Sequence, residues 1–230
     1  MVAELSIIKG KMKNKIVLVL TVFLFYSFAL QAQVQVSKEP FHKNVLENKY
    51  IRLLNVWLKP GDTSLFHIHS TPSVFLVFTT ANTVAQTKGG EWENVQYVKG
   101  HSWYRSFFQD TLIHRVAMSD TVSLHITDVE ILSSYDTNTK RASLQFPLLY
   151  ENEKVFAYTL TQNSFTSSII KNRGPMVAGL VAGNGIYINS VTGKKKKIKS
   201  GYFLYIEPAS SFYFSFKGKE KLNMVLFEIK

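Results

Sequence analysis

Two halves of this sequence resemble each other, and the repeat limits the fold to two copies of one structural unit. A shift of 102 residues places Leu58 on Leu160. At a nearly constant shift the two halves also end alike, because Val129–Leu132 aligns with Phe227–Lys230. A series of matches at one offset is typical of an internal duplication.

Each half consists of short apolar stretches separated by turn signals. Tyr50–Leu58 ends at the turn residues Pro60-Gly61-Asp62, Lys88-Gly89-Gly90 is typical of a hairpin tip, and Leu112–Met118 is another apolar stretch. No stretch shows a convincing helical period, and seventeen Phe and eleven Tyr favour strands. Short strands at regular spacing predict an all-β chain that forms antiparallel sandwiches or barrels.

The first 32 residues have the pattern of a secretory signal peptide. Four lysines between Lys9 and Lys15 precede the apolar run Ile16–Leu30, and Ala32 is a small residue suited to cleavage. The alternative is an uncleaved N-terminal anchor. We expect a periplasmic or secreted protein with no membrane span after signal cleavage.

Composition excludes several classes of function. The chain has no cysteine, which rules out a disulfide framework, a thiolate metal site and a cysteine nucleophile. The net charge is +11, but the lysines cluster at Lys194–Lys199 and Lys217–Lys221, which we interpret as solvated loops. We expect no nucleic-acid partner.

The stretch Pro60–His69 carries the strongest chemical signal. Side chains alternate along a strand, so His67 and His69 point to the same face. Two imidazoles on one face can bind one metal ion if a third ligand comes from a neighbouring strand. The alternative is that these histidines are ordinary polar lining of a barrel mouth.

The second half lacks every histidine of the first. The six histidines of the chain all precede residue 126. In the repeat, His67, His69 and His114 fall on Ile169, Lys171 and Phe212. This loss indicates that the three positions share a polar role that only the first copy retains.

These residues resemble the two sequence motifs of the cupin superfamily of small jelly-roll β-barrels. Gly61–His69 fits the first motif, G-x5-H-x-H, without a gap, and Gly100–His114 is similar to the second. The resemblance implies two tandem cupin-type antiparallel jelly-roll β-barrels. The expected division is a signal peptide at 1–32, a lead-in segment at 33–48, an N-terminal barrel at 49–135, a linker at 136–152 and a degenerate C-terminal barrel at 153–230.

The sequence departs from the family pattern at several positions. Where the motif has its metal-binding Glu, this chain has Ser73 or Val74. In the second motif the His follows the first Gly by 11 positions, whereas His114 follows Gly100 by 14. The three-His-one-Glu site of the family is therefore reduced to His67, His69 and His114, a set that some cupins use for iron.

Together with the signal-peptide pattern, the resemblance implies an exported cupin that binds a divalent transition metal (Fe, Zn, Ni, Mn or Cu) at one site, in the N-terminal barrel only, and/or a small molecule. The alternative is a metal-free, non-catalytic binding or dimerisation module, which the missing Glu favours. Whether the protein is an enzyme stays open. Cupins often pair through strands, so the resemblance allows a homodimer, although these residues do not indicate one.

Other polar residues have weaker signals. His101 and Tyr104 follow Gly100 and could supply a fourth ligand or a general base, or else be a loop histidine and a packing tyrosine. Four further residues are expected to be structural or without a chemical context: His42, His125, Glu130 and Glu228.

Overall fold

The computed structural model describes residues 33–135, 141–162, 165–216, 218 and 221–230. The predicted signal peptide lies outside these residues. Val34–Lys230 forms one compact unit. None of the described helices is long and apolar enough to cross a membrane.

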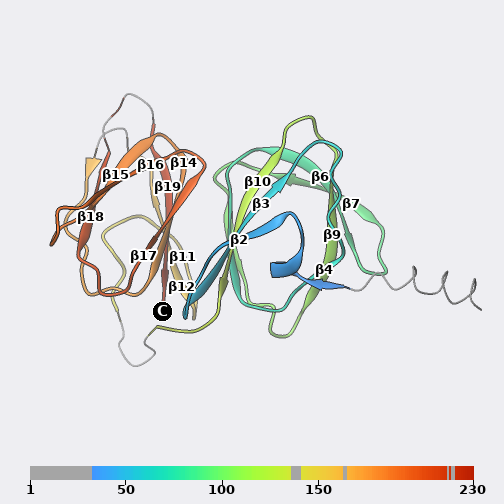
Figure 1. Ribbon diagram of the computed structural model, residues 1–230, viewed down its shortest axis with the longest axis horizontal. Coiled ribbons are helices and arrows are strands. Elements are labelled where there is room, and N and C mark those ends of the chain that lie inside the picture. Colours follow the sequence, from blue (N-terminus) through green and yellow to red (C-terminus); the bar gives the residue numbers. More distant parts are fainter. Residues whose placement is uncertain (1–32, 136–140, 163–164, 217, 219–220) are drawn as a thin grey trace, which may run out of the picture. The chain divides into compact units, whose positions relative to one another are not determined.

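Strands of the first half form two facing sheets (Figure 1). One sheet has the order β1-β4-β9-β6-β7 and the other β2-β3-β10-β5-β8. The strands are β1 (Val34–Gln35), β2 (His42–Glu47), β3 (Ile51–Leu58), β4 (His67–His69), β5 (Ser73–Val77), β6 (Ala81–Thr87), β7 (Trp92–Tyr97), β8 (Ser102–Arg105), β9 (Leu112–Met118) and β10 (Leu124–Ile131). These two sheets are called the N-terminal barrel below.

The second half repeats this arrangement. Its sheets have the orders β11-β12-β19-β14-β17 and β13-β18-β15-β16 and are called the C-terminal barrel. The strands are β11 (Leu148–Glu151), β12 (Val155–Leu160), β13 (Phe165–Thr166), β14 (Met176–Ala182), β15 (Asn184–Asn189), β16 (Lys195–Lys199), β17 (Tyr202–Ile206), β18 (Phe212–Phe216) and β19 (Asn223–Ile229). The predicted all-β class with tandem antiparallel jelly-roll barrels is confirmed.

The central strands of one sheet in the N-terminal barrel, β5 and β10, are buried on both faces. Phe75 and Val77 of β5 belong to the apolar core of their own barrel. Val74 and Leu76 between them pack in a cluster with Val177 and other residues of the C-terminal barrel. Because both faces are covered, β5 shows a continuous apolar run instead of the alternation of a half-exposed strand.

The contact between the barrels repeats the sequence duplication. Gly100 has φ 86° and faces Asn223, which lies 3.0 Å from the point a Cβ would occupy. Gly201, its counterpart, has φ 80° and faces His125. His125 and Asn223 align in the repeat. The glycine of each barrel therefore contacts the corresponding residue of the other barrel.

The lead-in segment and the linker contain more structure than the sequence pattern indicates. Residues 33–48, expected only as a lead-in segment before the barrel, contain β1, the 3₁₀ turn Val36–Lys38 and the six-residue strand β2. β1 pairs with β4 in one sheet and β2 with β3 in the other. The expected linker likewise contains β11, which pairs with β12.

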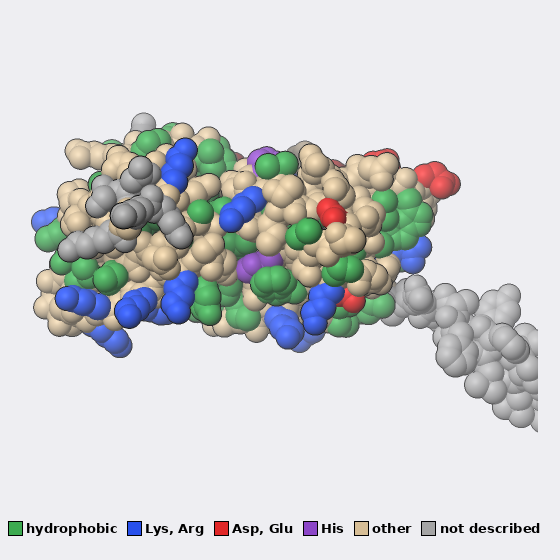
Figure 2. All heavy atoms as spheres, turned by 90° about the horizontal axis from the view of Figure 1, so that it is seen from above, with side chains coloured by type: hydrophobic (Ala, Val, Ile, Leu, Met, Phe, Trp, Pro, Cys, Tyr) green, Lys and Arg blue, Asp and Glu red, His purple; other side chains and the backbone are tan. Residues whose placement is uncertain are grey.

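Lysines at 194–199 do not form the solvated loop that their charge suggests. Residues Lys195–Lys199 are strand β16, which pairs with β15 and ends its sheet. The lysines of β16 are exposed and Ile198 is buried. Lysine on an edge strand hinders pairing with a second molecule. Figure 2 shows Lys and Arg side chains in several separate places on one face.

Candidate metal centre

A cavity of about 240 Å³ lies inside the N-terminal barrel, and four histidines reach it. Its remaining lining is mostly apolar. The residues that line it are His42, Val56, Leu58, Ser64, His67, His69, Phe75, Ala85, Val95, Tyr97, Trp103, Arg105, Phe107, Leu112, His114, Val116, Leu124, Ile126 and Asp128.

The three histidines predicted as ligands come together in this cavity. His67 and His69 are the two ends of β4, both buried on the inner face, while Ile68 between them is less buried. β9 runs antiparallel to β4 and places His114 directly opposite His67. The Nε2 atoms of His69 and His114 are 3.2 Å apart, and the rings of His67 and His114 are 4.5 Å apart between centroids.

His42 is a fourth histidine in the cluster, and the sequence analysis missed it. It begins β2 in the opposite sheet and is 9% exposed. Its ring centroid is 4.6 Å from that of His67, and one ligand atom from each of His42, His67 and His69 lies within 4.8 Å of the others. His42 precedes the apolar strands and belongs to no motif, so only the pairing of β2 with β3 places it here.

The Nδ1 atoms of three histidines face hydrogen-bond acceptors. Nδ1 of His42 is 2.6 Å from Oε2 of Glu39, and Nδ1 of His67 is 2.9 Å from the carbonyl oxygen of Leu65. A carbonyl oxygen only accepts, so the proton of neutral His67 is on Nδ1 and the lone pair is on Nε2. Metal-binding histidines in proteins usually have this second partner, which fixes the ring and the tautomer.

His69 has a weaker contact of the same kind, with Asp128. Nδ1 of His69 is 3.5 Å from Oδ2 of Asp128, a distance longer than a good hydrogen bond. Asp128 lies on β10 and is 1% exposed. It is the only carboxylate that lines the cavity in the described part of the chain.

Several buried polar atoms at the site have no hydrogen-bond partner among the described residues. They are Nε2 of His67, Nδ1 of His69 and both carboxylate oxygens of Asp128. Leaving such atoms unpaired in the interior costs free energy, and native proteins rarely do so without a water, an ion or a ligand. A cluster of unpaired donors and acceptors is therefore typical of a binding site.

Burial keeps His67 and His114 neutral. It lowers the pKa of His67 to about 2 and that of His114 to about 3, and the neighbouring histidines lower both further. A metal ion binds only the unprotonated imidazole nitrogen. These two histidines are thus in the ligand form at neutral pH.

One distance at the site, between nitrogens of His69 and His114, is close to that between two ligands of one metal ion. Two imidazole nitrogens about 2.0 to 2.1 Å from one tetrahedral zinc ion would lie roughly 3.3 Å apart. The 3.2 Å between Nε2 of His69 and Nε2 of His114 is close to this value.

The carboxylate expected by the family motif is absent from its place. Ser73 is fully buried and its hydroxyl donates to the carbonyl oxygen of Thr71, 3.1 Å away. Val74 packs in the cluster between the barrels. Asp128 supplies a carboxylate from a different strand, and no sequence motif marks it.

The longer second motif places an aromatic ring against the histidine cluster. Phe107 lies in the loop between β8 and β9, has φ 56° and is 3% exposed. Its ring stacks on that of His69 with 5.1 Å between centroids. The guanidinium of Arg105 lies 5.0 Å over the ring of Phe107 and bonds to Asp110.

His101 and Tyr104 do not reach the cavity. His101 is exposed and stacks on Trp103 with 5.2 Å between centroids. The hydroxyl of Tyr104 donates to Oε1 of Glu153 at 2.7 Å. Neither residue lines the cavity, so the structure supports the packing alternative for both.

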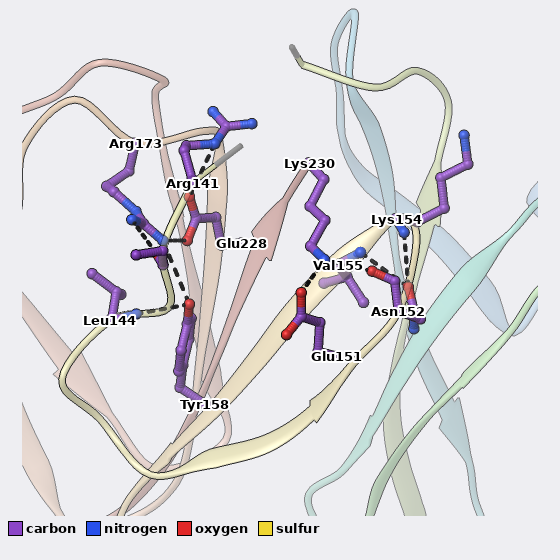
Figure 3. A network of polar contacts seen from close by, with 11 residues as sticks. Arg141, Leu144, Glu151, Asn152, Lys154, Val155, Tyr158, Arg173, Glu228 and Lys230 are labelled. Carbon is purple, nitrogen blue, oxygen red and sulfur yellow. Dashed lines mark hydrogen bonds and ion pairs between the residues drawn. The ribbon is translucent and has the colours of Figure 1, made fainter. Parts of the chain in front are cut away.

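His125 and the two repeated glutamates are held by structural contacts. His125 stacks between Trp57 and Phe78, and burial lowers its pKa to about 4. Glu130 forms an ion pair with Arg52. Figure 3 shows the matching ion pair of Glu228 with Arg173, in a network that also includes Arg141 and Tyr158.

Aromatic residues occupy the corresponding place in the C-terminal barrel. Ile170 pairs with Phe212 there, as His67 pairs with His114. The counterpart of His67 is therefore Ile170, one residue later than the predicted Ile169. Ile170 is buried, whereas Ile169 is exposed. The buried rings of Phe212, Phe214 and Phe216 fill this core.

Solved structures with the same arrangement of barrels identify the fold. The chain matches a cupin 2 conserved barrel domain protein from Leptotrichia buccalis with a TM-score of 0.55 and 11% identity, covering 88% of this chain and 94% of that one. The chain has the cupin fold. It also matches the protein YlbA from E. coli, with a TM-score of 0.57 and 12% identity, covering 83% of this chain and 85% of that one. A salicylate 1,2-dioxygenase from Pseudaminobacter salicylatoxidans matches with a TM-score of 0.56 and 10% identity, covering 78% of this chain and 71% of that one.

At these identities the likeness of this chain to the solved structures is one of fold alone. No protein-family model matches the sequence, and no curated protein matches it either. The function of the chain therefore has to be inferred from the cavity of the N-terminal barrel.

Proposed function

We propose that the N-terminal barrel binds one divalent transition metal ion through His67, His69 and His114 and holds a small molecule in the adjoining cavity. The observation that carries this proposal is the unpaired Nε2 of buried His67 beside the Nε2 pair of His69 and His114. Three neutral imidazoles suit Fe, Zn, Ni, Mn or Cu. Such an ion supplies Lewis acidity or activates oxygen.

The cavity favours a small and largely apolar ligand that carries a negative charge. Its volume of about 240 Å³ is just below the range of drug-sized sites, which begins at about 300 Å³. Phe75 and Trp103 form a stacked wall with 4.8 Å between centroids. Arg105 is the only Lys or Arg among the described lining residues, and guanidinium groups pair well with carboxylates.

Asp128 has two roles in this proposal. Its Oδ2 faces Nδ1 of His69 and orients that ring, and its carboxylate stays within the cavity, where it can accept a proton from a bound molecule. No contact of the described residues indicates which bond would change, so we propose binding and leave the reaction class open.

A metal-free binding module is the second candidate. The absence of a carboxylate at Ser73 and Val74 favours it, since the family motif supplies one ligand there. In this case water molecules would satisfy the unpaired atoms of His67 and Asp128.

Export is also proposed, from sequence alone. The lysines before residue 16 and the apolar run Ile16–Leu30 have the pattern of a signal peptide. Fusing residues 1–33 to a reporter enzyme that is active only outside the cytoplasm would test this. A reporter that stays inactive would contradict it.

Elemental analysis separates the two candidate functions. The protein is purified without a histidine tag after growth with added metals, beside His67→Ala, His114→Ala and the exposed control His101→Ala. Near-stoichiometric metal in the native protein and the control, but not in the two site variants, supports the metal centre. Metal in none of the four proteins would leave the metal-free module.

A further inference from the structure

We propose that the lead-in segment, residues 33–48, is part of the metal centre, with His42 as a fourth ligand and Glu39 as the residue that positions it. The bound ion would then fasten this segment to β4. This inference rests on the proposed function, because it adds a ligand to the same ion.

His42 reaches the cluster from the sheet opposite the other ligands. Its ring is 4.6 Å from that of His67 and 6.3 Å from that of His69 between centroids. One ligand atom from each of the three lies within 4.8 Å of the others, a spread that suits ligands of one ion. Nδ1 of His42 is bonded to Glu39, so Nε2 is the atom left for an ion.

Glu39 has the environment of a positioning residue. It is 2% exposed, and its Oε2 accepts from the backbone N–H of Phe41 at 2.8 Å as well as from His42. Its Oε1 accepts from the backbone N–H of Leu65 at 3.2 Å. The carbonyl oxygen of Leu65 accepts from His67. One buried carboxylate therefore connects the supports of two ligands.

The lead-in segment begins with a short paired stretch, and Val36 after it is buried. β1 contributes only the pairs of Val34 with His67 and of Gln35 with Ile68. Lys38 and Lys43 on either side of Glu39 are exposed. An ion bound by His42 and His67 would link β2 in one sheet to β4 in the other, and so would close the barrel across the cavity.

Four histidines restrict the kind of ion that leaves room for a ligand. A tetrahedral ion would have all its positions filled by protein, which is the arrangement of structural zinc sites. An ion that accepts six ligands keeps two positions free. We infer that a metal such as iron, nickel or manganese would support ligand binding here, whereas zinc would mainly stabilise the fold.

Zinc affinity tests the role of His42. Competition with a chromophoric chelator is measured for the full chain, His42→Ala, His42→Cys, Glu39→Gln and the control His101→Ala. We expect His42→Ala and Glu39→Gln to bind zinc about 10- to 100-fold more weakly than the native chain. His42→Cys should recover much of the affinity, because a thiolate is also a zinc ligand. His101→Ala should be unchanged.

Limited proteolysis tests whether zinc itself protects the lead-in segment. If His42 had only a structural role, added zinc would not change the rate of cleavage through His42. Added zinc should slow tryptic cleavage after Lys38 and Lys43 in the native chain and in His101→Ala, but not in His42→Ala. Equal zinc affinity and equal protection in His42→Ala would overturn this inference and leave the three-histidine site standing. A native chain that binds neither zinc nor Fe, Ni, Mn or Cu would overturn both, and for a chain that takes one of these ions instead of zinc the same comparison is made with that ion. Far-ultraviolet circular dichroism checks that each variant is folded. If His42→Ala is not folded, Glu39→Gln still tests the inference.

Discussion

At the residue scale, the site depends on the partners behind the histidines as much as on the histidines themselves. The alternation of β4 allowed His67 and His69 to be predicted on one face. Asp128 and His42 could not be found in this way, because they come from the other sheet and only strand pairing brings them in. A single histidine or aspartate in a strand gives no periodic signal.

Replacing Asp128 tests the support of His69. We expect Asp128→Asn to bind zinc about 10-fold more weakly, because the amide orients the imidazole less strongly than a carboxylate does. Isothermal titration calorimetry measures the change. Asp120→Asn is the matched control, since Asp120 lies in the loop between β9 and β10, outside the cavity lining. Equal affinity of all three proteins would contradict the role given to Asp128.

The pKa of the buried histidines predicts how stability depends on pH in the metal-free protein. Their folded-state pKa values, about 2 for His67 and about 3 for His114, lie below the unfolded value of about 6.5. The unfolded chain therefore binds more protons between these limits. The free energy of unfolding should be highest above pH 6.5 and should fall on acidification by at most about 1.4 kcal/mol per pH unit for each histidine.

Urea unfolding at pH values from about 7 down to about 4 measures this slope. His114→Gln removes one of the titrating groups and should flatten the pH dependence. A variant that follows the native pH dependence throughout would show that His114 titrates normally in the folded state.

At the element scale, strands with turn signals at both ends were predicted and the polar lead-in strands were not. Leu112–Met118 is β9 with the expected bounds, and the turn at Pro60-Gly61-Asp62 is present, with φ 87° at Gly61. β2 was missed because its sequence, HKNVLE, has little apolar alternation. It forms because β3 offers it a full edge for hydrogen bonding.

Two adjacent phenylalanines in the loop after β8 provide a matched pair. Phe107 is 3% exposed and stacks on His69, whereas Phe108 is 69% exposed. We expect Phe107→Ala to lower the free energy of unfolding by about 3 kcal/mol and Phe108→Ala by less than about 0.5 kcal/mol. Urea denaturation of the two variants measures the difference. Equal effects would show that the loop does not hold Phe107 in the cavity.

At the scale of the whole molecule, the two barrels share an apolar cluster, although only the N-terminal barrel has the histidine cluster. Gly179 of β14 lies against Leu76 of β5, and a Cβ at this glycine would be 2.3 Å from Cδ2 of Leu76. The duplication in the sequence predicted two similar units. It did not predict this contact, because continuous apolar strands do not indicate what covers their outer face.

Calorimetry tests whether the barrels unfold together. We expect one transition for the native chain, because the cluster spans both barrels. Gly179→Val should destabilise the chain by about 1 to 3 kcal/mol through overpacking, and should separate the transition into two. Two resolved transitions in the native chain would show that the barrels are energetically independent.

The most direct test of the metal centre is an anomalous-difference map from crystals of the protein loaded with zinc. We expect one strong zinc peak per chain inside the N-terminal barrel, within about 2.0 to 2.1 Å of Nε2 of His67, His69 and His114. A cavity without a peak, or peaks only at surface residues, would contradict it.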